Sequence, residues 1–134
     1  MLKRKAFYPI ASIVERAILK AKQDNAFKTF EIYSPDGTLV DSGHVTSIST
    51  FYTDTEVLFQ VVVDAGLMTG TVDISYDFNR IKVYGYLFDV DSMSFTNVKV
   101  MYFDFILSKV YSKPAGKGVH IVLTYKVGGL VGGD

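Results

Sequence analysis

Hydrophobic positions repeat with two different periods along the chain, and the change of period divides it into two parts. From residue 10 to residue 21 the apolar side chains follow the i, i+3, i+4, i+7 spacing of one helical face. Pro9 suits a first helical turn, where its missing N–H costs nothing. Ser12 with Glu15 matches a capping box, which leaves a later start open. We expect an amphipathic helix over residues 9–23.

After residue 25 the apolar positions recur every second residue, which is typical of strands. Residues 71–78 alternate most regularly, so we expect a strand there with one core face and one solvent face, then a reversal at 78–80. Residues 55–64 are apolar on both faces, which predicts a central or doubly covered strand. The remaining expected strands are 27–33, 38–41, 43–52, 81–90, 94–111 with a bend near Asp104, and 119–127.

Short turns separate these strands, and residues 34–37 (Ser-Pro-Asp-Gly) are the clearest of them. A parallel crossover needs a dozen or more residues, usually a helix, and the sequence offers no such segment after residue 25. We therefore expect a mainly β (α+β) fold in which one N-terminal amphipathic helix packs on an antiparallel β-sandwich or barrel of seven to eight strands. The pattern leaves sandwich and barrel open.

The 134 residues are enough for one domain with its own core. We expect a single domain over residues 1–134, whose parts are a basic N-terminal arm at 1–8, the helix at 9–23, the antiparallel β domain at 27–127 and a glycine-rich tail at 128–134.

Cysteine is absent from the sequence, which excludes disulfides, thiolate metal sites and cysteine nucleophiles. The basic start is followed by a stretch too interrupted for a secretory signal, and no run approaches the length of a membrane-spanning helix. The compartment stays open between the cytoplasm and a virion, and we expect no transmembrane segment.

The net charge is zero, but the charges are unevenly distributed. Residues 1–28 hold seven Lys and Arg against two acids, residues 29–104 hold three against eleven, and residues 105–134 hold four against one. The basic ends and the acidic middle can meet within one subunit, or opposite patches can meet between subunits and fix their register. Neutral overall charge and many acids on the strands argue against nucleic-acid binding.

Candidate chemistry is sparse. The two histidines, His44 and His120, fall on polar sides of strands and are interpreted as surface residues, since a zinc site needs three protein ligands. Asp89 and Asp91 alternate as in a calcium loop but lack its further ligands, so a hairpin turn explains them. Residues 113–118 combine Gly with Lys without phosphate-loop spacing, and are interpreted as a basic hairpin tip.

An aromatic strip is formed by Tyr84, Tyr86 and Phe88 on one face of a strand whose other face is also apolar. This strand is predicted either to lie in the core under the helix or to present an aromatic patch to a partner. Gly85 between the two tyrosines indicates a bulge or a close backbone approach.

We predict a non-enzymatic structural domain that forms a homo-oligomer, such as a ring, tube or shell component of a virion or tail, with itself and other assembly proteins as partners. Paired edges between subunits would also remove an aggregation hazard. One alternative is a small apolar-ligand-binding β-barrel with the helix as lid. A second is an enzyme with an Asp/His/Tyr cavity.

The sequence assigns no catalytic, cofactor-binding or metal residue. The candidate interface residues come from the basic start, the aromatic strip, the basic hairpin tip and the tail: Lys3, Arg4, Lys5, Tyr84, Tyr86, Lys113, Lys117, Gly128 and Leu130.

Overall fold

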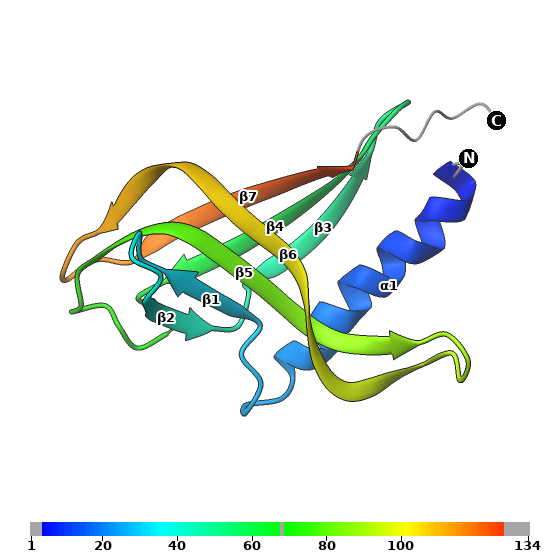
Figure 1. Ribbon diagram of the computed structural model, residues 1–134, viewed down its shortest axis with the longest axis horizontal. Helices are drawn as coiled ribbons and strands as arrows, with labels where there is room; N and C mark the ends of the chain where they lie inside the picture. Colours follow the sequence, from blue (N-terminus) through cyan, green and yellow to red (C-terminus); the bar gives the residue numbers. More distant parts are fainter. Residues whose placement is uncertain (1–3, 68, 128–134) are drawn as a thin grey trace.

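A computed structural model describes residues 4–67 and 69–127, with side chains from residue 12 onward. Those residues form one helix and seven strands (Figure 1). Their bounds are α1 (Arg4–Lys22), β1 (Phe30–Tyr33), β2 (Leu39–Gly43), β3 (Ser47–Tyr52), β4 (Val57–Ala65), β5 (Tyr76–Asp89), β6 (Ser94–Lys113) and β7 (Val119–Val127).

The strands make two antiparallel sheets, which confirms the predicted α+β sandwich. One sheet has the order β2-β1-β5-β6 and the other the order β3-β4-β7. Among the described strands the two sheets do not join into a closed barrel, so of the two predicted forms the sandwich is the one that the protein adopts. Within the described residues, no helix has the length and apolar character needed to cross a bilayer.

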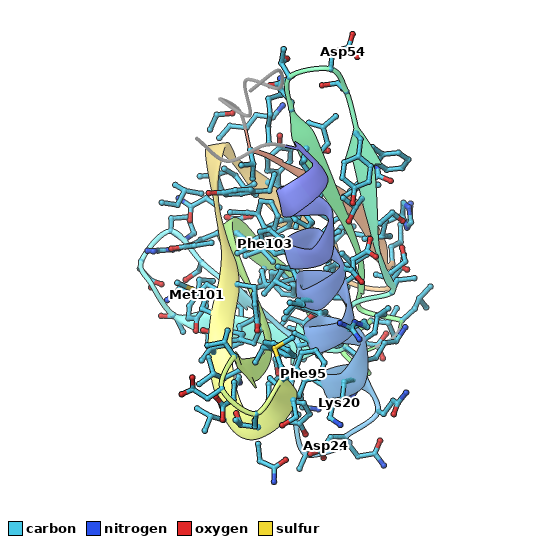
Figure 2. The ribbon with its side chains drawn as sticks, turned by 90° about the vertical axis from the view of Figure 1, so that its right-hand side faces the viewer. Lys20, Asp24, Asp54, Phe95, Met101 and Phe103 are labelled. Carbon is cyan, nitrogen blue, oxygen red and sulfur yellow. The ribbon has the colours of Figure 1, made fainter. Side chains whose placement is uncertain are left out.

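The helix lies at the opening between the two sheets, against β5 on one side and β3 on the other. Figure 2 looks onto this side and shows α1 between the β5–β6 ribbon and β3–β4. Its buried stripe contains Ala17, Ile18 and Ala21, each fully shielded from water, as the helical spacing predicted. The helix begins at Arg4 rather than residue 9, so Pro9 lies in its second turn, and it ends one residue earlier than expected.

The core fills the space between the inner faces of the two sheets. Ile32 of β1, Ile81 and Val83 of β5, and Val61 and Val63 of β4 are completely buried. Strand β4 is central in its sheet, as predicted. Only one of its faces is fully buried, however, because the outer face has no covering layer.

The β5–β6 hairpin differs most from the sequence prediction. The expected reversal at residues 78–80 is wrong, because β5 runs unbroken from Tyr76 to Asp89. Asn79 instead occupies a register shift: Phe78 pairs with Tyr111 and Arg80 with Ile106, so β6 carries extra residues here. Two further shifts follow along the same hairpin. Bulges bend and twist a strand, which accounts for the curved ribbon in Figure 1.

The register shift between Val83 and Tyr84 leaves Tyr102 as an extra residue of β6, so its two neighbours, Met101 and Phe103, lie on opposite sides of the sheet. Figure 2 shows Phe103 on the side of the helix and Met101 directed away from it. Phe103 is 4% exposed and Met101 is 49% exposed, which places the first in the core and the second on the outer surface.

Candidate functional site

Strand β7 has one paired edge and one free edge. Nine consecutive residues, Val119–Val127, pair with β4 without a register shift. Its other edge has no strand partner among the described residues, and none of their backbone hydrogen bonds joins it to β6. A straight edge with unsatisfied N–H and C=O groups is a template for pairing with another strand.

A cleft of about 270 Å³ lies beside this free edge, between β7 and the last part of β6. Apolar side chains dominate its walls: Phe78 from β5, Leu107 and Tyr111 from β6, and Ile121 and Leu123 from β7. Phe78 and Tyr111 stack with ring centroids 5.9 Å apart. The register shift opposite Asn79 falls at this end of β6, so the extra residues of β6 carry Leu107 to the cleft.

The border between β6 and β7 exposes more large apolar side chains than a solvated strand pair requires. An aromatic cluster anchors it, since the ring of Tyr125 lies 5.3 Å from that of Phe103 and 6.2 Å from that of Phe105. The exposed residues on this border are Val110 (51%), Tyr111 (42%), Val122 (50%) and Tyr125 (43%). Clustered exposure of this kind marks interaction surfaces.

His120 and Asp64 meet at the rim of the cleft because they are register partners across β4 and β7. His120 Nδ1 lies 2.6 Å from Asp64 Oδ1, and the hydroxyl of Thr46 donates to Asp64 Oδ2 at 2.5 Å. These two hydrogen bonds, first that from Thr46, hold the pKa of Asp64 below its ordinary value. The imidazole is 63% exposed, which confirms the interpretation of His120 as a surface residue.

His44 does not match the same interpretation fully. It is half-buried, and its Nδ1 has no hydrogen-bond partner among the described residues. Burial, followed by the charges of Lys28 and Lys22, lowers its pKa. The described residues contain no group of three or more His, Asp or Glu side chains placed to hold a metal ion.

A buried polar cluster fixes the segment between β4 and β5, and sequence reasoning missed it. Asp41 is 5% exposed, and its Oδ2 accepts hydrogen bonds from Thr71 (2.8 Å), Tyr76 (2.7 Å) and Thr69 (3.2 Å). Burial, and next the hydrogen bond to Asp41, raises the pKa of Tyr76 above its ordinary range. Buried carboxylates need such donors because water no longer solvates them.

Lys113 completes this cluster from the other side. Its side chain is 1% exposed, and Nζ donates to the carbonyls of Val72 (3.0 Å), Ile74 (2.5 Å) and Pro114 (3.1 Å). Residues 71–75 are therefore held by these side chains and by backbone bonds to the turns at Gly66 and Gly116 rather than by a neighbouring strand, and the strand predicted there begins only at Tyr76. The candidate interface residue Lys113 is therefore buried within the subunit, and its ammonium is directed to backbone carbonyls of the same chain.

The tyrosines of the aromatic strip contact other side chains of the same subunit and are not fully exposed on the surface. Tyr86 is 8% exposed, lies edge-on to Phe27 at 4.7 Å and donates its hydroxyl to Asp24 Oδ2 at 2.8 Å. Tyr84 is half-buried, and the ammonium of Lys99 lies 4.4 Å from its ring centre. The strand was predicted either to lie in the core under the helix or to present an aromatic patch, and the burial of Tyr86 agrees with the first of these predictions.

The remaining interface candidates divide between the surface and the undescribed parts of the chain. Lys117 is exposed in the turn between β6 and β7. Arg4 and Lys5 lie in α1, but their side chains are outside the described set, and Lys3, Gly128 and Leu130 lie outside the described residues altogether.

Comparison with known proteins gives no relative: no family model, no curated protein and no solved structure matches this chain.

Proposed function

We propose that this protein is a non-enzymatic assembly domain whose copies join edge to edge through β7. The observation that carries the proposal is the combination of a regular, free nine-residue edge with an apolar cleft and exposed apolar side chains directly beside it. A strand of nine residues spans about 30 Å, long enough for a continuous ladder with a neighbour.

The occupant that best fits this edge is β7 of a second copy, running antiparallel. Such a contact is self-complementary about a two-fold axis, so the same patch serves both subunits. Two three-stranded sheets would then become one six-stranded sheet. Residues 121–125 at the middle of β7 carry no charge, so the centre of the contact places no like charges opposite each other.

A larger ring, tube or shell needs a second contact of a different kind, since a single two-fold contact closes at the dimer. The charge distribution supplies a candidate. The ion pairs found among the described side chains are Arg80–Asp104, Lys99–Glu31, Lys126–Glu56 and His120–Asp64, and none involves Arg16, Lys20 or Lys22, the basic residues of α1 whose side chains the structure describes. Arg16 and Lys20, which are exposed, can therefore meet the acidic middle of a neighbouring copy, whereas the ammonium of Lys22 already donates to the Thr46 carbonyl at 2.9 Å.

Light scattering of the purified chain tests the proposal with two matched variants. Val122→Lys places a charge on the free edge of β7, and Leu39→Lys places the same charge on the free edge of β2. The two positions are equally exposed, at 50% and 49%. We expect an oligomer for the wild type and for Leu39→Lys, and a smaller particle for Val122→Lys. A wild-type monomer at all concentrations, or equal effects of both variants, would count against assembly through β7.

A further inference from the structure

A second hollow lies far from the β7 edge, between α1 and the tip of the β5–β6 hairpin. Its volume is about 710 Å³, which is within the range of about 300–1,000 Å³ typical of small-molecule sites. Ile13, Arg16 and Lys20 line it from the helix, and Phe88, Met93 and Phe95 line it from the hairpin. None of these residues belongs to the β7 edge or its cleft, so this groove is independent of the contact through β7, although it shares Arg16 and Lys20 with the second, charge-based contact.

The hairpin side of the groove is an apolar floor with a fixed shape. Phe88 and Phe95 are register partners, and their rings meet edge to face at a centroid distance of 5.1 Å. Both rings are half-buried, so each keeps part of its surface in the groove. Ile13 faces them from the helix and is also half-buried.

Met93 adds an apolar group at a backbone position that does not suit it. Its φ is 54°, and it is the non-glycine residue with positive φ among the described residues. Asn, Asp and Gly occupy this left-handed region at lower cost than a long side chain. The Met93 side chain is 70% exposed, so core packing does not explain the choice. Local strain that presents an apolar side chain at a groove indicates a functional constraint.

The helix side of the groove is positively charged. Arg16 lies with its guanidinium carbon 5.9 Å from the centre of the Phe95 ring. Neither Arg16 nor Lys20 forms an ion pair with any residue that the structure describes. Nearby Asp89 is engaged within the hairpin turn, where it accepts hydrogen bonds from the Asp91 N–H and the Ser92 hydroxyl. The two cations are therefore available to an external anion.

We propose that this groove binds a single-chain amphiphile with a carboxylate head group. The hydrocarbon chain would lie on Phe88, Phe95 and Met93, and the head group would meet Arg16 and Lys20. Residues 12 to 20 of a helix extend over about 12 Å, which suits one extended chain. A bilayer is the less favoured partner, because Asp89 and Asp91 at the hairpin tip would face anionic lipid head groups.

Titration calorimetry with three ligands that share a dodecyl chain tests this site. Laurate, dodecyltrimethylammonium and dodecyl maltoside are each used below their micelle concentrations. Laurate is expected to saturate one site per chain. The cationic and neutral ligands are expected to bind about tenfold more weakly, as loss of two partly exposed charge contacts implies.

Variants assign the binding to the groove. Arg16→Gln with Lys20→Gln should weaken laurate binding about tenfold, whereas Lys109→Gln, an exposed cation on β6, should leave it unchanged. Met93→Ser should weaken all three ligands, since it removes apolar contact without touching charge. Circular dichroism confirms that each variant remains folded.

Three results would overturn the proposal. The first is equal binding of the three ligands, and the second is laurate binding that the double variant does not change. The third is sedimentation of the wild-type chain with phosphatidylglycerol vesicles in the absence of any laurate binding, which would replace the groove by membrane docking.

Discussion

Gly85 of β5 lies directly against the backbone of Ala17 in α1. A Cβ atom built on Gly85 would stand 2.9 Å from the Ala17 carbonyl carbon and oxygen, closer than folded proteins allow. The residue without a side chain therefore sets how deeply the helix enters the opening between the sheets. This contact confirms one of the two roles that the sequence suggested for Gly85.

Replacing Gly85 with alanine should destabilise the protein by about 1–3 kcal/mol, because the helix must move away from the sheet. Gly116→Ala is the control: Gly116 has a φ of 81° but nothing within 4 Å of an added Cβ, so it measures backbone strain alone. Urea unfolding compares the two variants. Gly85→Ala should also shift contacts of Ala17 and Ile18; an unfolding free energy equal to that of the wild type would show that the close approach is not limiting.

Lys113→Met should loosen the segment between β4 and β5. The substitution keeps the length and apolar stem of the side chain but removes the ammonium donor from the Ile74 carbonyl, and from the Val72 carbonyl, which keeps only the bond from the Gly116 N–H. We expect a loss of about 2–3 kcal/mol, since these are charge-assisted bonds to buried groups.

Hydrogen exchange locates this effect. Amides of residues 66–75 should exchange faster in Lys113→Met, while amides of β4 should lose protection only as far as global stability falls. Lys117→Met, at an exposed position of the adjoining turn, should change stability by less than about 0.5 kcal/mol. Similar behaviour of the two variants would remove Lys113 from its structural role.

Asp104 should make stability depend on pH. Arg80 donates from Nε to Asp104 Oδ1 at 2.9 Å, and this pairing holds the pKa of Asp104 below its ordinary value of 3.8. A depressed folded-state pKa stabilises the protein above the ordinary value, and that contribution disappears as the pH falls through the folded-state pKa.

Asp104→Asn should therefore be less stable than the wild type near neutral pH, with the difference vanishing in acid. The difference should be small, because the Arg80 side chain is 42% exposed. Chemical unfolding at about pH 7 and about pH 2.5 measures it. A gap between the two proteins that widens toward low pH would contradict this account.

The sequence pattern predicted the elements in which burial depends on one face of a single helix or strand. The stripe of Ala17, Ile18 and Ala21 identified the buried face of the helix. The alternation of residues 119–127 gave the bounds of β7. In both cases one face of one element determines burial, and side-chain period reports that face directly.

Long-range contacts explain what the patterns missed. Residues 71–75 alternate like a strand, but Asp41 and Lys113, which lie about 30 to 40 positions away in the sequence, bind them as a loop. The pairing of His120 with Asp64 depends on the register of β4 and β7, which composition does not report. Burial of Lys113 gives no sequence signal, since lysine is ordinarily exposed.

The proposed assembly site was likewise predicted only in part from the sequence. The sequence indicated unpaired edges and complementary charges, and its interface candidates came from the charged ends and the aromatic strip. The free edge of β7 and its cleft follow from sheet order, and the split of the strands into two sheets could not be read from a single chain.

Measuring the distance between spin labels on neighbouring copies tests assembly through β7 most directly. The chain has no cysteine, so one introduced thiol is a unique labelling site. Thr124→Cys places a spin label on β7, and Leu39→Cys places one on β2 as the control. Adjacent antiparallel β7 strands predict an inter-copy distance below about 20 Å for the first label, from strand spacing and a few residues of offset, and a longer one for the second. Absence of a short distance at position 124, or a short distance at position 39 alone, would contradict assembly through β7.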